Sequence, residues 1–590
     1  MPTQRNRSQT ASVAILGLLA CLTFLGCLGS VDLWGKREQR SAAEAIDTIT
    51  ENHWLIAQIQ NRPRLEKPPL PRWIIASLMT ITNRRDEWIV RLPSALAAVG
   101  MVGLVYLLGK RIGGHEVGLA SGLVLTSFGF FIAELRQAGN DGPLAFFTTL
   151  AIYAAWRRLH PEGAEPGIGA RRWVILFSIS LGLGFLTKGP IIILVVGMAL
   201  LPYLLIEKRL KAGLRLLVDG WGVPCFLGLA LSWPVPVILS DPNAIRIWYL
   251  EMAQKTGTAG IHHAKYRPPL VVDWPWMAAP WVFIALSGMV IPFVKRSRED
   301  RPRGLWMLWF WTVGNLIMFC LWTVAKPNYY LPCMPGMAIL CGLEWVRICR
   351  EARAAVPLAI RMIQFHWVGW FSLALAAPVV ASQLSPLLLP HITLIAAAVV
   401  LGVLGSAVIW RKGADAASLI PLTASMTFGV MIGYGAIAPR ENGDHSHRDL
   451  ALRLDALPIG TDEPLLFYHE LDEGLWFYLK RHVLRPVPGT NPTYNEGFDL
   501  AEAASKHQLI LDPTLRYEAE KIKLIDWARD TKNTSRYFLM REKDLKSFGT
   551  TLDKLVTPIY REPKRKRNEL VLLKVSGHDL ASEKSESMIR

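Results

Sequence analysis

The sequence predicts a polytopic α-helical membrane protein that ends in a soluble α/β domain. Hydrophobic residues make up 51% of the 590-residue chain, whereas charged residues make up only 19%, below the roughly 25% of a water-soluble domain. The apolar residues form long unbroken runs instead of alternating stripes. After Pro439 these runs become short and polar segments separate them, which marks a second kind of structure.

A spanning helix needs about 20 mostly apolar residues, and the runs predict about thirteen such helices. The first is expected to be an uncleaved helix with its N-terminus inside, although Leu19-Ala20-Cys21 also fits a cleaved lipoprotein signal. An odd number of spans places the two chain ends on opposite sides of the membrane. The expected spans are 11–31, 92–108, 117–135, 143–156, 173–187, 190–206, 216–239, 280–294, 305–324, 330–345, 367–382, 387–410 and 419–437.

The basic residues give a net charge of +17, and most of them lie in short clusters between the apolar runs. This pattern is typical of cytoplasmic loops of a membrane protein and argues against nucleic-acid binding. Loop 32–91 breaks the rule because it is basic yet predicted outside; the other large outer loop is 240–279. All seven cysteines lie within or beside apolar runs, so neither a disulfide framework nor a zinc site is predicted.

The chain therefore divides into a transmembrane domain at 1–439 and a soluble extracytoplasmic domain at 440–590. Short apolar segments at 465–468, 509–511 and 570–573 are expected to form strands, separated by polar and helical stretches. About 150 residues is an ordinary domain size.

Polar residues of many kinds are predicted to gather at the outer membrane boundary, whereas the opposite face carries mainly basic clusters. Charged groups at this boundary cost a few kcal/mol unless they are paired or wetted, so their convergence suggests a functional site. The outer set consists of Glu38, Arg40, Arg62, Arg64, Glu66, Lys67, Arg136, Asn140, Asp141, Lys188, Glu251, His262, His263, Lys265, Lys326, Asn328, Tyr329 and Tyr330.

Single members of this set also have purely structural interpretations. Lys188 and Lys326 fit anchors at helix ends whose ammonium groups reach the interface. Asp141 precedes Gly-Pro and fits a helix cap. Tyr329 and Tyr330 fit an interfacial aromatic belt. The set as a whole favours a site.

Five short motifs then occur in a fixed order. They are Leu65-Glu66-Lys67-Pro68-Pro69-Leu70, Arg91-Leu92-Pro93-Ser94-Ala95, Asp141-Gly142-Pro143-Leu144, Thr187-Lys188-Gly189-Pro190 and Lys326-Pro327-Asn328-Tyr329-Tyr330-Leu331-Pro332. Together they resemble the bacterial polyprenyl-phosphate-sugar glycosyltransferases of the GT-C fold, which include the lipid A aminoarabinose transferases and the protein O-mannosyltransferases. The resemblance implies a GT-C-like domain in the bacterial inner membrane, among membrane lipids. It also implies a polyprenyl (undecaprenyl) phosphate-linked sugar as donor and an extracytoplasmic lipid or protein as acceptor.

The sequence departs from the family at one position. The family pattern in the first outer loop is Asp-Glu-x-Arg after Leu-Trp, whereas here Leu33-Trp34 is followed by Arg37-Glu38-Gln39-Arg40. Arginine thus stands where the resemblance implies the catalytic aspartate. The candidate carboxylates become Glu38, which is adjacent to that position, and Asp141.

Transfer from a lipid phosphate requires cations for the phosphate and, for a hydroxyl acceptor, a carboxylate base. An acceptor that is itself a phosphate is already anionic and needs less help. Glu66 is expected to shape the site, with Glu38 or Asp141 as base or sugar-orienting group. The candidates for phosphate binding are Lys67, Lys188, Lys326, Arg40 or Arg64, and Tyr329 or Tyr330.

No Asp-x-Asp motif for a metal–nucleotide-sugar occurs in the extramembrane loops, which agrees with a lipid-borne donor. Glu251, His262 and His263 could ligate a divalent metal, but their spacing is nonspecific, so no metal or other cofactor is assigned.

Two other function classes stay open, a multi-span transporter or lipid permease and a membrane scaffold whose outer domain binds a partner. Transporters tend to show repeats and charges at the membrane midplane, and neither is visible here. A scaffold would tolerate mutation of the outer lysines. The sugar and the acceptor are also open, between mannose to protein and aminoarabinose to lipid A.

Overall fold

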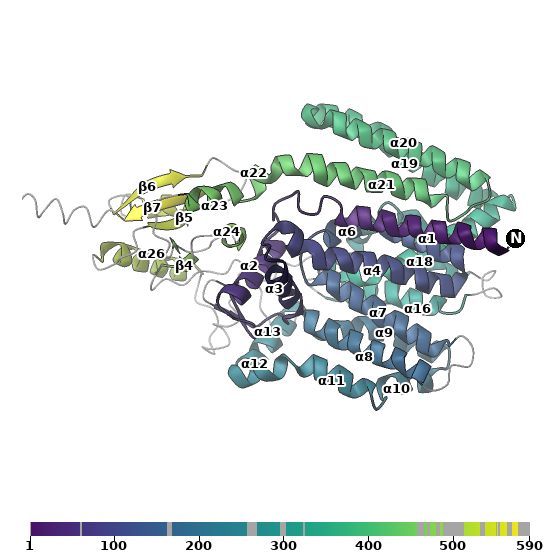
Figure 1. Cartoon of the computed structure of the whole chain (residues 1–590), viewed down its shortest axis with the longest axis horizontal. Helices are drawn as coiled ribbons and strands as arrows, with labels where there is room; N and C mark the ends of the chain where they lie inside the picture. Colours follow the sequence, from purple (N-terminus) through teal and green to yellow (C-terminus); the bar gives the residue numbers. More distant parts are fainter. Residues whose placement is uncertain are drawn as a thin grey trace, which may run out of the picture.

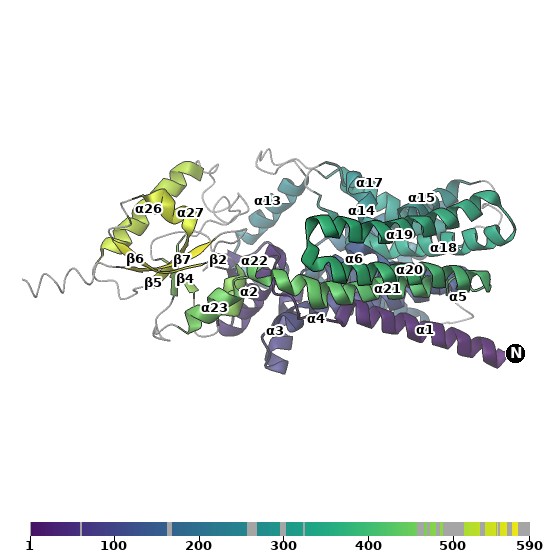
Figure 2. The ribbon, with the colours of Figure 1, turned by 90° about the horizontal axis from the view of Figure 1, so that it is seen from above.

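The protein is an elongated bundle of helices with a small β-sheet beyond one end (Figure 1). The N-terminus lies at the far end of the bundle from this sheet (Figure 2). The computed structural model describes residues 2–59, 62–161, 168–256, 268–294, 302–322, 325–456, 465–468, 473–479, 484–487, 513–530, 537–549, 552, 555–562 and 569–575.

Seven helical segments of the described chain are long and apolar enough to cross a membrane, and an eighth is a broken pair. The predicted number of thirteen is therefore not confirmed, because several expected spans fold as shorter helices or break, as 305–324 does. The seven are Arg7–Leu25, Glu87–Gly113, Gly222–Ser240, Pro327–Arg353, Pro357–Gln383, Pro386–Arg411 and Leu419–His445.

The long helices of the bundle are α1 (Pro2–Leu25), α4 (Glu87–Gly113), α7 (Asp141–Leu159), α8 (Ile168–Lys188), α9 (Ile191–Ile206), α18 (Met334–Arg353), α19 (Pro357–Leu384), α20 (Leu389–Arg411) and α21 (Leu419–Ile432). The shorter ones are α3 (Leu70–Thr82), α5 (His115–Ser127), α6 (Gly129–Leu135), α10 (Leu210–Leu217), α11 (Gly222–Leu231), α12 (Pro234–Ser240), α13 (Ala244–Thr256), α14 (Trp274–Met277), α15 (Val282–Val290), α16 (Leu305–Trp309) and α17 (Asn315–Cys320). Helix α2 (Lys36–Thr50) and the hairpin of β1 (Ala57–Ile59) and β2 (Arg62–Arg64) occupy the first large loop.

Helix α18 is the centre of the bundle. It is buried along 94% of its most apolar stretch, whereas α19, α20 and α21 are buried along only 22–28% of theirs. The latter three expose apolar side chains, as expected for helices that face lipid.

The eighth span is broken where the polar residues of the outer boundary begin. Helices α5 and α6 meet at an angle of 65°, with Phe128 between them in an extended conformation. Just after α6, the buried Arg136 donates hydrogen bonds to the carbonyl oxygens of Thr23 (2.5 Å) and Gly26 (2.7 Å). These carbonyls close the end of α1, where no helical amide is available to satisfy them. Arg136 therefore fixes the α6–α7 connection against α1.

The C-terminal part contains a five-stranded mixed sheet in the order β4-β3-β5-β7-β6. Strand β3 is parallel to β4 and β5, while β7 is antiparallel to β5 and β6. The strands are β3 (Leu465–Phe467), β4 (Leu484–Pro486), β5 (Tyr537–Arg541), β6 (Val556–Arg561) and β7 (Leu570–Val575). The helices around them are α22 (Asn442–His445), α23 (Arg448–Asp455), α24 (Glu473–Tyr478), α26 (Pro513–Arg529) and α27 (Glu542–Phe548).

Alternating side chains of this sheet enter two separate cores, because successive residues of a strand point to opposite faces. On β7, Val571 and Leu573 pack in a core with Trp527 of α26. Leu570 and Leu572 pack instead in a core that includes residues of α2, α3 and the start of α4. One face of the sheet thus shares its core with the outer loops of the bundle.

Polar contacts reinforce this shared core. Arg40 of α2 pairs with Glu473 of α24 at 3.2 Å, and the hydroxyl of Tyr478 accepts a hydrogen bond from the amide of Leu33 at 2.8 Å. Arg448 lies between the buried carboxylates of Asp32 (3.1 Å) and Glu87 (3.3 Å). Contacts with the C-terminal part therefore hold the loop before α2, α2 itself and the start of α4 in place.

Candidate functional site

Asp141 is the centre of a polar cluster at the sheet-facing end of the bundle. One oxygen, Oδ1, contacts the ammonium of Lys188 at 2.5 Å. The other, Oδ2, accepts hydrogen bonds from the amide of Asn328 at 2.7 Å and from Arg37 at 3.3 Å. Arg37 also pairs with both oxygens of Glu134, at 3.1 and 3.0 Å. Four segments that are distant in the sequence thus meet at one carboxylate.

Local structure places the two central residues face to face. Asp141 begins α7 and Lys188 ends α8, so each charge complements the dipole of its own helix. Gly189 follows Lys188 with a φ of +75°, a left-handed conformation that favours glycine and ends the helix there. The motifs Asp-Gly-Pro and Lys-Gly-Pro thus fix where the helices start and stop.

Lys67 forms the second half of the site. It pairs with Glu251 of α13, and the phenol of Tyr329 also acts electrostatically on it. The ammonium of Lys188 lies 4.3 Å from the centre of the Tyr329 ring. The Tyr329 ring thus lies against Lys188, and its phenol influences the charge of Lys67. We call Arg37, Lys67, Glu134, Asp141, Lys188, Asn328 and Tyr329 together the boundary cluster.

Electrostatics keep Asp141 and Lys67 charged. Burial alone would raise the pKa of Asp141, but the Lys188 ammonium and the Arg37 guanidinium outweigh it and hold the pKa below its ordinary value. Burial likewise lowers the pKa of Lys67, and the Glu251 carboxylate more than compensates, so the pKa is raised. The cluster can thus present fixed cations to an anionic ligand at neutral pH.

Glu66 lies directly before Lys67 and differs from the other carboxylates. Its Oε2 atom is buried and has no hydrogen-bond partner within the described part of the chain. A buried carboxylate oxygen without a partner costs free energy, and a ligand hydroxyl would satisfy it.

Glu38, a predicted catalytic carboxylate, is placed in a structural ion pair instead. Arg91 donates to both of its oxygens, at 2.7 and 2.9 Å, and the two side chains are only 5% and 2% exposed. The amide of Ala138 donates a third hydrogen bond to Glu38 at 3.1 Å. The remaining donors of Arg91 satisfy backbone carbonyls at the end of the first helix, among them that of Leu28. Both oxygens of Glu38 are thus engaged in contacts that hold the structure together.

Other predicted members do not join the cluster. Arg40 pairs with Glu473 toward the sheet, and Arg64 pairs with Glu44 of α2 at 2.5 Å. Tyr330 is fully buried and donates to the carbonyl of Thr312 within the bundle, because consecutive residues of a helical turn point in different directions. Lys326 is exposed at the start of the same turn.

The proposed metal ligands are only partly visible. Glu251 pairs with Lys67, whereas His262 and His263 lie outside the described residues. Within the residues that are described, no group of three or more His, Cys, Asp or Glu side chains is arranged to hold a metal ion.

Arg37, Glu134 and Asn328 belong to the cluster although sequence reasoning assigned them no role. Asn328 was visible inside the fifth motif, next to Tyr329. Glu134 was the harder residue to find, because it lies within a predicted apolar span, yet a carboxylate in such a position is itself a signal of a site.

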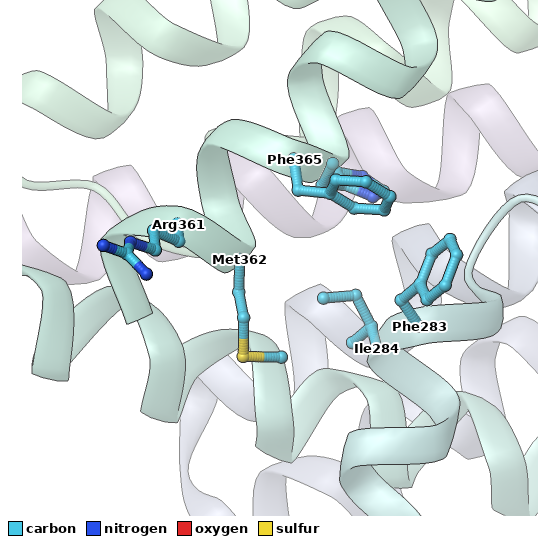
Figure 3. A pocket seen from close by; sticks show the side chains of 6 residues that line it. Phe283, Ile284, Arg361, Met362 and Phe365 are labelled. Atoms are coloured by element: carbon cyan, nitrogen blue, oxygen red, sulfur yellow. The ribbon is translucent and has the colours of Figure 1, made fainter. Parts of the chain in front are cut away.

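A groove of about 400 Å³ lies elsewhere on the bundle, between α15 and α19. Figure 3 shows Phe283, Ile284, Met362 and Phe365 around it, with Arg361 at one end. It contains no carboxylate and shares no residue with the boundary cluster.

The chain is similar to known proteins in sequence and in fold. The sequence pattern of the dolichyl-phosphate-mannose-protein mannosyltransferase family matches residues 66–233, which include Lys67, Glu134, Asp141 and Lys188. Relatives named undecaprenyl phosphate-α-4-amino-4-deoxy-L-arabinose arabinosyl transferase occur in Pseudomonas. The protein of Pseudomonas fluorescens Pf0-1 is 27% identical over 56% of this chain. The protein of Pseudomonas paraeruginosa PA7 is 27% identical over 63% of it. The chain spans 58% and 65% of the lengths of these relatives.

The fold matches a solved structure over nearly its whole length. ArnT from Cupriavidus metallidurans, bound to undecaprenyl phosphate, covers 95% of this chain with a TM-score of 0.74 at 19% identity, and 98% of ArnT is covered. The apo structure of the same protein gives a TM-score of 0.75. The resemblance drawn from the five motifs is thus confirmed, and the fold is GT-C-like.

Proposed function

We propose that this chain is a membrane glycosyltransferase that moves a sugar from polyprenyl (undecaprenyl) phosphate to an extracytoplasmic acceptor. The observation that carries the proposal is the boundary cluster at one end of a bundle of membrane helices, in which Lys188 pairs with Asp141 and lies against the Tyr329 ring, while Lys67 pairs with Glu251. The fold of ArnT and the names of the sequence relatives support the same donor class.

The donor needs a cationic site because its leaving group is a phosphate. Lys67 and Lys188 come from different segments; Tyr329 acts electrostatically on Lys67, and its ring lies against the ammonium of Lys188. Charge-assisted hydrogen bonds from two ammonium groups would neutralise the phosphate as it leaves. Tyr329 and the exposed Lys326 are the further candidates beside them.

The carboxylates would orient the sugar and its cationic neighbours. Asp141 holds Lys188, and the buried Oε2 of Glu66 is ready to accept a hydrogen bond from a sugar hydroxyl. Glu38 would contribute through Arg91, which ties α2 to α4 and to the end of α1. Precise placement of the reacting atoms is itself worth several kcal/mol of the barrier.

The proposed location is the bacterial inner membrane, with the N-terminus inside and residues 440–590 outside. The bundle and the sheet occupy opposite ends of the molecule, with the boundary cluster on the sheet side (Figure 2). Basic loops such as 207–215 and 347–361 would then face the cytoplasm.

The test is to incubate the purified protein with a panel of polyprenyl-phosphate sugars, including aminoarabinose and mannose, and to measure by mass spectrometry which donor loses its sugar. Lys188→Ala and Glu66→Ala should each lower the rate by about 10²–10³-fold, the typical cost of one charge-stabilising group. Lys412→Ala, on an exposed loop between α20 and α21, is the matched control. Turnover at the wild-type rate by the Lys188→Ala, Glu66→Ala double variant would contradict the proposal.

The acceptor can be identified in the same assay. Lipid A and an unfolded protein rich in serine and threonine would each be offered to the protein with the donor that it consumes. A labelled lipid product supports the aminoarabinose class of relatives, and a labelled polypeptide supports the mannosyltransferase class.

A further inference from the structure

Within the described part of the chain, Glu134 is the carboxylate of the boundary cluster that is hydrogen-bonded to a single, half-exposed side chain. It lies in the last turn of α6, and both oxygens accept from one nitrogen of Arg37, at 3.1 and 3.0 Å. The Glu134 side chain is 17% exposed and that of Arg37 is 51% exposed. This pair therefore borders on solvent at the edge of the cluster.

Two other carboxylates, Glu38 and Asp141, are already committed to structural contacts, and the free oxygen of Glu66 is the one proposed above to accept from a sugar hydroxyl. Glu38 is locked between Arg91 and the amide of Ala138. Both oxygens of Asp141 accept from neighbours, of which Lys188 and Asn328 are the closest. A general base needs an oxygen that the acceptor proton can reach, so neither residue meets this requirement without losing structural contacts.

Arg37 is shared and so can be released. It bridges Glu134 and Asp141, and burial of its guanidinium opposes the charge that the two carboxylates stabilise. The charge of Lys188 also acts on Glu134, so the pair lies within electrostatic reach of the proposed phosphate site. An arriving phosphate would compete with Glu134 for Arg37, because arginine binds phosphate and carboxylate oxygens in the same bidentate way.

We infer that Glu134 is the base that deprotonates the acceptor hydroxyl, and that Arg37 moves from Glu134 to the donor phosphate as the donor binds. This inference rests on the proposed function. The acceptor oxygen forms a bond to the anomeric carbon, and the bond from that carbon to the phosphate oxygen breaks. Its electron pair leaves with the polyprenyl phosphate. The acceptor proton passes to Glu134 and later to water.

The arrangement also accounts for the departure at position 37. Where the family resemblance implies an aspartate, this chain has a cation, and the carboxylate is supplied by Glu134 from a different helix. A cation thus takes the position of the family's aspartate, and Glu134 supplies the carboxylate next to it.

Chemical rescue separates a base from a structural residue. Glu134→Ala and Glu134→Gln should lower kcat with a hydroxyl acceptor by about 10²–10⁴-fold, the usual contribution of a positioned base. Azide is a small anion that needs no deprotonation, so it should restore consumption of the donor by Glu134→Ala and yield a glycosyl azide. Glu134→Asp should retain part of the rate, and its activity should still fall at acidic pH as in the wild type. Glu134→Gln should no longer show this acid limb of the pH profile.

The matched controls are Glu51→Gln, an exposed acid at the end of α2, and Asp141→Asn, whose loss azide should not repair. Arg37→Gln should raise the KM for the donor more than it lowers kcat. An unchanged rate in Glu134→Gln overturns the inference. The inference is also overturned if azide does not rescue Glu134→Ala and Glu134→Asp retains no activity, because Glu134 would then act only structurally. If the wild-type protein consumes no donor from the panel, the proposed function itself has failed.

Discussion

The substitution Glu38→Gln tests whether the buried pair of Glu38 and Arg91 is structural. Glutamine keeps one oxygen for Arg91 but turns an amide group toward its guanidinium, which is 5% exposed and surrounded by carbonyls. Removing one partner of a buried ion pair costs about 3–5 kcal/mol. Even the lower value corresponds to roughly a 100-fold shift of the folding equilibrium. The main effect of removing the Glu38 charge should therefore be a lower free energy of unfolding.

The assay is equilibrium unfolding in mixed micelles, followed by tryptophan fluorescence and run beside the transfer assay well below the unfolding transition. Glu38→Gln should lower the unfolding free energy by about 3–5 kcal/mol and retain most transfer activity while folded. The Glu38→Leu, Arg91→Met double variant should recover only part of the loss, because Arg91 also satisfies carbonyls such as that of Leu28. Wild-type stability combined with abolished transfer in Glu38→Gln would show that Glu38 is a chemical group and that this reasoning is wrong.

Two further predictions follow from the pKa shifts. Glu251→Gln leaves burial as the main influence on Lys67, so the pKa of this ammonium falls, and the KM for the donor should begin to rise at a lower alkaline pH than in the wild type. His160, at the end of α7, has its pKa lowered from 6.5 to about 4 by burial and by Arg209. The unfolded state therefore binds more protons between these two values, and stability should fall as the pH drops from about 6.5 to 4. His160→Gln should give a flatter stability curve in thermal melts recorded across that pH range, and an unchanged curve would contradict the assignment.

Sequence reasoning identified much of the cluster because its members lie at helix ends. Lys67, Asp141, Lys188 and Tyr329 each border an apolar run, and the ends of neighbouring antiparallel helices meet at the same level of a bundle. Convergence at one boundary was therefore predictable without knowing which helices are neighbours.

The partners within the cluster were not predictable, because they depend on contacts between distant segments. Arg91 and Glu38 are 53 residues apart, and Arg37 and Glu134 are 97 residues apart. Nothing in the local sequence indicates which of two adjacent residues, 37 or 38, turns into the bundle and which turns toward the site. The number of spans was not predictable either, because apolar composition does not reveal where a helix bends or shortens, as it does at Phe128.

The core shared by α2 and the β-sheet has a consequence for any attempt to separate the two parts of the chain. Cutting after Pro439 would strip Arg448 from two buried carboxylates, those of Asp32 and Glu87. The same cut would expose the apolar face of α2 around Ile46 to solvent. The helix that carries Arg37 would then lose its support on one side. Residues far from the boundary cluster thus help to determine whether the cluster is preformed.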